Sequence, residues 1–110
     1  MGYIFVMKIK QTPRFKKWIS ALKDKQAKAR ILIRLKRMIE GNPGDVKPVD
    51  AGVYEMRIHV GKGYRVYYIA LENLIIVLLC GGDKSSQKED IERAKEMAAE
   101  ARRETWKYKT

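Results

Sequence analysis

Residues 53–84 read VYEMRIHVGKGYRVYYIALENLIIVLLCGGDK, three strand-like runs separated by two short turns. In the first two runs apolar and polar residues alternate, as expected for strands that bury only one face. The third run, residues 74–80, is apolar at every position, which is typical of a central strand covered on both faces. We therefore expect a three-stranded antiparallel meander at the centre of the fold.

The turn at residues 61–63 (Gly-Lys-Gly) sets the pairing of the first two strands. A three-residue loop with a left-handed glycine places His59 opposite Arg65 and Arg57 opposite Tyr67, and it keeps apolar and polar side chains on separate faces. A two-residue loop would mix the faces, because a slip of one residue exchanges them. The polar, solvent-facing side of the sheet then carries the best candidate site: Glu55, Arg57, His59, Arg65 and Tyr67.

Length and charge restrict the class of protein. A chain of 110 residues is expected to form one domain, residues 1–110, with a modest core, and an apolar share of 45% suits a folded protein. The formal net charge of +11 predicts a polyanionic partner, first nucleic acid and second an acidic protein. A membrane surface is a weaker candidate, because the basic residues are spread over several expected elements.

Cys80 is the single cysteine, so an internal disulfide is excluded and a reduced, cytoplasmic location is expected. The apolar run at residues 74–80 is too short to cross a bilayer, and the N-terminus lacks the pattern of a signal peptide. No set of residues has metal-ligand spacing, a phosphate-binding glycine loop or a Ser-His-Asp pattern. We expect neither a metal nor a cofactor.

Upstream of the meander, the pattern predicts a strand and two helices. Residues 3–9 are rich in β-branched and aromatic residues, as strands are. A helix should begin at Thr12-Pro13, with the hydroxyl as cap and proline in the first turn. A second helix should run from a cap at Asp24 to about Glu40, before Gly41. The two helices can cover one face of the sheet with the following residues: Phe15, Trp18, Ile19 and Leu22 from the first, and Ala27, Ile31, Leu35, Met38 and Ile39 from the second.

Two further segments flank the meander. Residues 44–52 are expected to be a loop with at most a short edge strand at residues 46–47, because Pro48 argues against a central strand. After the meander, Ser86 and Glu89 have the spacing of a capping box, so a C-terminal helix should begin there. Its buried stripe is expected to be narrow and made of small residues: Ile91, Ala94, Ala98 and Ala101.

The runs GVYEMRIHVGKGYRVYY (residues 52–68) and LLCGGDKSSQKEDI (residues 78–91) resemble the toxins of bacterial RelE/ParE-type toxin–antitoxin modules. Within that superfamily the chain is most similar to the HigB-like group, often labelled addiction module killer proteins, and the similarity extends over residues 12–94. The resemblance implies an α+β fold. In this fold a twisted antiparallel sheet of about four to five strands carries an N-terminal helical hairpin and a C-terminal helix.

The resemblance also implies a function. RelE-like and HigB-like toxins cut mRNA in the ribosomal A site, whereas ParE-like toxins poison DNA gyrase. Both are silenced by an antitoxin, which in the HigB-like group usually carries a helix-turn-helix DNA-binding domain. We therefore expect a ribosome-dependent mRNA endoribonuclease whose partners are such an antitoxin, the ribosome and mRNA, with DNA reached only through the antitoxin. A gyrase inhibitor and a degenerate toxin confined to operon repression are the alternatives.

Four positions correspond to residues of the RelE-like nucleases. Arg65 matches the sheet arginine that contacts the scissile phosphate, and Lys84 falls near the arginine after the last strand. Arg57 and Glu55 fall where those nucleases carry two strand lysines, so Glu55 reverses the usual charge. The C-terminal catalytic tyrosine is missing, and Asp90 or Gln87 stands roughly in its place.

RNA cleavage without a metal requires a base, an acid and stabilisation of the phosphorane charge. The arginine fork suits the last task, so Arg57 and Arg65 are expected to perform it with help from Lys84; the alternative is that they form ion pairs with Glu55 and with carboxylates of the last helix. His59, whose ordinary pKa is near 6.5, is a candidate acid or base, although an exposed, idle histidine is the alternative at a hairpin tip. Glu55 is a second candidate base, or it orients Arg57.

The remaining candidates concern RNA binding. Tyr67 is expected to stack on a base or to donate a proton. Arg30, Arg34 and Arg37 share one face of the second expected helix, which either contacts phosphates or is a solvated surface. Lys62, in the hairpin turn, and Gln87 complete the expected RNA-binding set.

Overall fold

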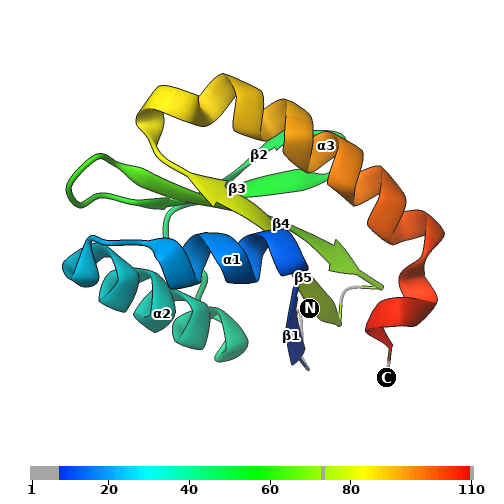
Figure 1. Cartoon of the computed structure of the whole chain (residues 1–110). Helices are drawn as coiled ribbons and strands as arrows, with labels where there is room; N and C mark the ends of the chain where they lie inside the picture. Colours follow the sequence, from blue (N-terminus) through cyan, green and yellow to red (C-terminus); the bar gives the residue numbers. More distant parts are fainter. Residues whose placement is uncertain (1–7, 73, 110) are drawn as a thin grey trace.

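The computed structural model describes residues 8–72 and 74–109. Five strands and three α-helices lie within these ranges (Figure 1). Along the chain the elements are β1 (Lys8–Gln11), α1 (Pro13–Ala21), α2 (Lys25–Ile39), β2 (Val46–Asp50), β3 (Val53–Ile58), β4 (Tyr64–Leu71), β5 (Ile75–Gly82), the 3₁₀ turn η1 (Lys84–Ser86), α3 (Gln87–Arg103) and the 3₁₀ turn η2 (Thr105–Tyr108).

The strands form one sheet in the order β1-β5-β4-β3-β2. The meander β3-β4-β5 is antiparallel, as expected. Strand β2 is longer than the expected residues 46–47, because Pro48 is tolerated at the edge of the sheet, and it is also antiparallel. Strand β1 runs parallel to β5, so the sheet is mixed. The alternation of residues 53–71 favours hairpins and hence antiparallel neighbours, whereas the residues of an edge strand do not encode its direction. Residues 3–7 of the expected first strand lie outside the described residues.

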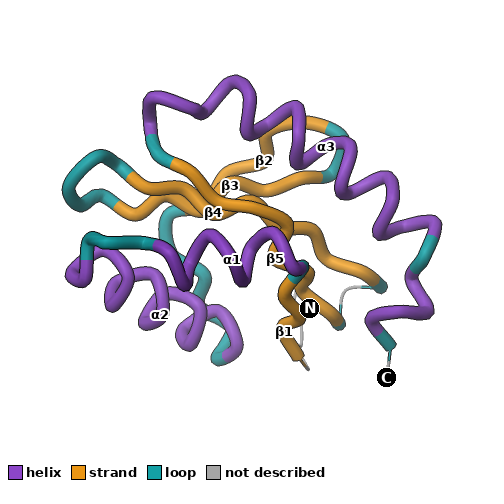
Figure 2. The backbone as a smooth tube through the Cα atoms, viewed as in Figure 1, coloured by secondary structure: helices purple, strands orange, loops and turns teal. Residues whose placement is uncertain are grey.

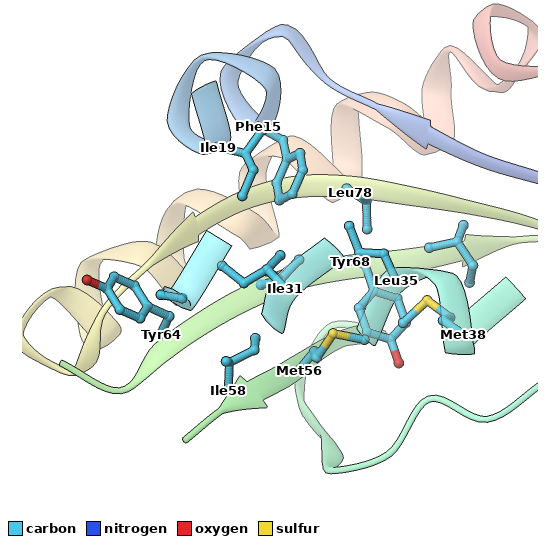
Figure 3. Packing of buried hydrophobic residues seen from close by; sticks show 13 residues of the cluster. Phe15, Ile19, Ile31, Leu35, Met38, Met56, Ile58, Tyr64, Tyr68 and Leu78 are labelled. Atoms are coloured by element: carbon cyan, nitrogen blue, oxygen red, sulfur yellow. The ribbon is translucent and has the colours of Figure 1, made fainter. Parts of the chain in front are cut away.

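Helices cover both faces of the sheet (Figure 2). The hairpin of α1 and α2 packs on one face, and Figure 3 shows Phe15 and Ile31 meeting Met56, Tyr68 and Leu78 there. On the other face the alanine stripe of α3 covers a second cluster, which includes Tyr67, Ile69 and Leu71 of β4. Strand β5 contributes side chains to both clusters, which confirms the expectation of a central strand buried on two sides.

Both expected helix starts in the N-terminal half are confirmed. The Thr12 hydroxyl accepts a hydrogen bond from the Phe15 N–H, and the Asp24 carboxylate accepts one from the Ala27 N–H. Thr12 also donates to the Leu79 carbonyl at 2.6 Å, which anchors α1 to the centre of the sheet. The buried side of α2 is as expected except for Ile39, which is 50% exposed because it lies on the outer side of the last turn.

The expected capping box at Ser86 and Glu89 is wrong. The box forms one turn earlier, between Asp83 and Ser86, and it opens the 3₁₀ turn η1. The Ser86 hydroxyl instead donates to the buried Asp90 carboxylate at 2.6 Å. Two overlapping start patterns compete here, and Asp83 prevails because its carboxylate accepts from both the backbone N–H and the hydroxyl of Ser85.

The β3–β4 pairing differs by two residues from the expected one. Arg57 lies opposite Arg65 instead of Tyr67, and the connecting loop spans residues 59–63. Gly61 and Gly63 both have a left-handed φ, which fits the longer turn. A shift of two residues keeps every strand side chain on its expected face, so alternation alone cannot distinguish the two registers.

Gly82 pairs with Arg65 in the β4–β5 ladder, and a Cβ there would collide with the Asp90 carboxylate and the Ser86 hydroxyl. We expect Gly82→Ala to lower the free energy of unfolding by about 1–3 kcal/mol, the usual effect of overpacking. Urea denaturation would measure it. If the collision is the cause, the effect shrinks in an Asp90→Ala background; an unchanged effect there would contradict this explanation.

Candidate functional site

Arg57 and Arg65 are direct cross-strand neighbours, so their side chains leave the sheet on the same face, the face that α3 covers. A shared face on adjacent strands was expected, whereas the direct pairing follows from the corrected register, and the two side chains are less accessible than expected. Their exposed fractions are 31% for Arg57 and 12% for Arg65. The pair therefore lies at the border of the α3 interface, where the packing of neighbours holds each guanidinium group in place.

Glu55 lies beneath the two arginines and is fully buried. Its Oε1 accepts from Arg57 Nε at 3.0 Å, and its Oε2 lies 3.6 Å from Arg65 Nε. The same Oε2 accepts from the Tyr67 hydroxyl at 3.1 Å and from Gln87 Nε2 at 2.9 Å. One buried carboxylate thus joins residues of β3, β4 and the start of α3.

The charge state of Glu55 follows from these contacts. Burial raises the pKa of the carboxyl, but hydrogen bonds from Arg57, Gln87 and Tyr67 and the charge of Arg65 outweigh burial, so the pKa lies below its ordinary value. A buried carboxylate with this set of donors has neither access to a substrate proton nor the basicity to take it. The geometry therefore favours the orienting role of Glu55 over the role of base.

Tyr67 and Gln87 are enclosed by the same network. Tyr67 is fully buried, so its ring cannot stack on an RNA base, contrary to expectation. Burial, together with the Glu55 charge, raises the pKa of its hydroxyl far above the ordinary value. Gln87 directs its amide N–H at Glu55. Both side chains serve to fix the carboxylate that the arginines contact.

A shallow surface hollow of about 460 Å³ opens beside the arginine pair. Four of the expected site residues line it together with the glycine turn: His59, Lys62, Arg65 and Lys84. His59 lies in the loop after β3, is mostly exposed, and contacts Asp45 Oδ2 through Nε2 at 2.5 Å. The hydrogen bond from His59 lowers the pKa of the Asp45 carboxyl. The hollow therefore combines three cations with one imidazole.

Arg65 is only partly satisfied by its protein partners. Its Nη1 donates to the Gly63 carbonyl at 3.0 Å, while its Nε is buried and has no hydrogen-bond partner within the described part of the chain. The Nε of Arg34 in α2 is in the same state, and the Arg65 Nε faces the Glu55 carboxylate at 3.6 Å, so this atom does not by itself mark a site. The charge of Arg65 and its place in the lining of the hollow give it the features of an anion-binding side chain.

The three arginines of α2 do not form one RNA-binding set. Arg34 is turned inward, where Nη1 donates to the Arg57 carbonyl at 2.6 Å and Nη2 donates to the carbonyls of Pro43 and Asp45. It therefore ties α2 to the start of β2 and is structural. Arg30 and Arg37 remain exposed, but α2 packs on the face of the sheet opposite the arginine pair (Figure 1).

A larger hollow, about 770 Å³, lies between the end of α1 and the hairpin turn. Trp18 and Tyr64 line it, and Gly61 and Lys62 line both hollows. The sequence pattern assigned Trp18 only to the buried stripe of α1. Gly81 is the signal that was missed, because a Cβ there would collide with the indole ring, and the missing Cβ lets Trp18 lie on the strand and border the hollow.

Two other expectations concern single features. Cys80 is buried, and burial raises the pKa of its thiol to about 12, so the geometry fits a packing role. None of the helices in the described ranges combines the length and apolarity that a membrane span requires.

Comparisons with known proteins add three findings. A family model described as phage-derived protein Gp49-like (DUF891) matches residues 17–103. An uncharacterized protein of Haemophilus influenzae (strain ATCC 51907 / DSM 11121 / KW20 / Rd) is 49% identical over 94 residues, which cover 86% of this chain and 95% of that protein. The free-state structure of an arginine-to-alanine double mutant of E. coli toxin RelE superposes with a TM-score of 0.56 at 16% identity, over 74% of this chain and 88% of that one.

Proposed function

Because the chain belongs to the family of Gp49-like phage-derived proteins (DUF891), a RelE/ParE-type toxin family, we propose that this toxin of a toxin–antitoxin module is a ribosome-dependent mRNA endoribonuclease. The observation that carries the proposal is the arginine pair, Arg57 and Arg65, held by the buried Glu55 beside a cationic hollow. A gyrase inhibitor acting by binding alone would not need a preorganised anion site of this kind.

In the proposed reaction Arg65 is the principal phosphate ligand. The 2′-hydroxyl loses its proton as its oxygen bonds to phosphorus, and the bond from phosphorus to the 5′-oxygen breaks as that oxygen takes up a proton. The phosphorane between these two events carries the added negative charge, and a fixed guanidinium fork can donate to two of its oxygens. Glu55 holds the Arg65 side chain through Nε, the inner edge of the guanidinium, so the outer edge is left for the substrate. Lys84 and Lys62 add charge at the hollow, and Arg57 supports the carboxylate that orients Arg65.

His59 is the side chain best suited to move protons. A general acid or base must reach the substrate, and the burial of Glu55 and Tyr67 removes the two other candidates. His59 is exposed and lines the same hollow as Arg65. Asp45, in contact with Nε2, would hold the imidazole ring and stabilise its protonated form during proton transfer.

The ribosome would supply what the protein site lacks. Correct alignment of the 2′-hydroxyl and the phosphate can lower a barrier by about 7–11 kcal/mol, which allows a site with one titratable group to cleave RNA. The net charge of +11 would attract the chain to ribosomal RNA. The antitoxin, proposed to carry a helix-turn-helix domain, would prevent this encounter.

We expect His59→Ala to reduce the rate of mRNA cleavage about 100-fold, because general acid–base catalysis commonly contributes at least this much. Primer extension on mRNA in a purified translation system would measure the rate. Asp45→Asn keeps the size of the group in contact with Nε2 and removes its charge, so it should lower the rate by a smaller factor than His59→Ala. An unchanged rate in His59→Ala would remove the histidine from the mechanism.

Mapping transcript ends after induction tests the function itself. New 5′ ends within translated regions, lost when translation initiation is blocked, would support ribosome-dependent cleavage. An SOS response with intact transcripts would instead support gyrase inhibition. Growth without arrest, combined with binding to the antitoxin, would identify a degenerate toxin.

A further inference from the structure

A second apolar stripe follows the outer side of α2. Leu32, Ile33 and Ile39 are 52%, 49% and 50% exposed, although each is a large aliphatic side chain. With Ala29 and the stem of Lys36 they occupy positions separated by three or four residues, so they form one continuous strip along the helix. The buried stripe of α2 already packs against the sheet, so the exposed strip is not needed for packing within the isolated chain.

Exposed aliphatic side chains that gather on one helix usually mark a contact surface. The described residues contain three other large apolar side chains with comparable exposure, Tyr54, Leu74 and Trp106, and none of them is on α2. The strip also lies on the opposite side of the sheet from Arg57 and Arg65 (Figure 1). Whatever covers the strip therefore need not touch the proposed phosphate site.

The charges around the strip indicate which kind of partner surface would be complementary to it. Helix α2 contains six basic residues and no acidic one: Lys25, Lys28, Arg30, Arg34, Lys36 and Arg37. Arg34 is turned inward. Arg30 and Arg37, which are seven residues apart, lie along one side of the strip, and Lys28 lies along the other side. A complementary surface is apolar along its centre and acidic along both edges, the pattern of an amphipathic acidic helix.

Three other occupants fit less well. RNA would satisfy the arginines but would leave the aliphatic side chains without an apolar partner. A second copy of this chain would place two sets of cations against each other, because α2 carries no acidic residue. A bilayer would require Lys36, in the middle of the strip, to enter the acyl region with the leucine and isoleucines.

We propose that the outer face of α2 is the docking surface for an amphipathic acidic helix of the antitoxin. The proposal rests on the proposed toxin function and adds the place and chemistry of the neutralising contact. It implies that binding of the antitoxin and contact with the scissile phosphate use opposite faces of the sheet. Neutralisation would then act by excluding the toxin from the ribosome and would leave the arginine pair uncovered.

The test uses the full chain and, as probe, the purified product of the reading frame beside its gene. Affinity is measured by titration calorimetry in an Arg65→Ala background, which allows expression. We expect the double substitution L32D/I39D to weaken binding about 30-fold or more, as loss of central apolar contacts does. Trp106→Asp, at a side chain that is 68% exposed, is the matched control and should bind normally. Circular dichroism should be unchanged in both variants, because the substituted side chains are exposed.

In cells, L32D/I39D with Arg65 intact should arrest growth and should resist rescue by the neighbouring gene product. Undiminished affinity of L32D/I39D for the probe would overturn the proposal, as would failure of the unsubstituted chain to bind it. Three other results would also overturn the proposal, each in favour of another occupant. L32D/I39D could dissociate a dimer of the free chain, which would indicate a second copy, or it could abolish binding to phosphatidylglycerol vesicles, which would indicate a bilayer. It could also lose toxicity while it still binds the probe normally, which would indicate RNA. Absence of growth arrest by the unsubstituted chain would count against the proposed function alone, since affinity is measured on purified proteins.

Discussion

Replacing Arg65 with alanine is expected to abolish growth arrest and to lower the rate of mRNA cleavage by at least about 10³-fold. Arginine side chains that stabilise a phosphoryl transition state commonly contribute 10³-fold or more, and Arg65 is the arginine that lines the hollow. Its Nε lies 3.6 Å from Glu55 and its Nη1 caps the hairpin turn, so the group cannot be replaced by movement of a neighbour. Primer extension on translated mRNA would measure the loss.

The interpretation requires that Arg65→Ala remains folded. Arg57, Tyr67 and Gln87 still donate to Glu55 in this variant, so the buried carboxylate keeps its hydrogen bonds. Arg65→Lys should recover part of the activity, because lysine restores the charge without the planar fork. Arg103→Ala, on the exposed last turn of α3, is the matched arginine control. A folded Arg65→Ala chain with full toxicity would contradict the proposed mechanism.

The second large effect concerns stability. Glu55→Ala is expected to lower the free energy of unfolding by about 3–5 kcal/mol, the usual result of removing one partner from a buried ion pair. The change leaves two guanidinium groups, a tyrosine hydroxyl and an amide without their common acceptor. Free energies of unfolding of about 5–15 kcal/mol are typical of whole proteins, so this single change could remove a large part of the total stability. Urea denaturation of Glu55→Ala would measure it, with Glu96→Ala, an exposed carboxylate on α3, as control.

The same carboxylate should make stability depend on pH. The pKa of Glu55 is lowered in the folded chain, so its contribution is fully present above the ordinary carboxyl value, about 4.3, and is lost as the pH falls through the lowered one. Glu55→Gln has the same shape and no titration. The difference in unfolding free energy between the natural chain and Glu55→Gln should therefore shrink as the pH falls below about 4. A constant difference would show that Glu55 is not charged in the folded state.

Much of the candidate site could be predicted from alternation alone. Arg57, Arg65, Tyr67 and Glu55 were expected on one face, and they share it. Alternation could not predict how deeply each of these side chains is buried. Glu55 and Tyr67 occupy polar-face positions in the pattern but lie under the N-terminus of α3, where Gln87 closes over them. The prediction of a solvent-facing cluster was therefore wrong for Glu55 and Tyr67, because the helix that covers them is far away in the sequence.

The α2 arginines illustrate the same limit. Three arginines at helical spacing were expected to act alike, yet Arg34 is directed to the carbonyl groups of Pro43, Asp45 and Arg57. Pro43 and Asp45 lie in the loop before β2 and Arg57 lies in β3, so these acceptors come together beside α2 only in the folded chain. Conversely, the exposed Ile39 was expected in the core, because the periodicity of α2 contains two apolar stripes and does not say which one meets the sheet.

The sequence by itself determined the three strands of the meander, the helix starts, the central position of β5 and the side of the sheet on which each meander residue lies, because these depend on local periodicity and on caps within a few residues. Only the tertiary structure decided the hairpin register, the parallel direction of β1, the burial of Glu55 and the outward position of Leu32 and Ile39. Each of these depends on contacts between segments distant in the chain, and a residue carries no record of which neighbour will cover it.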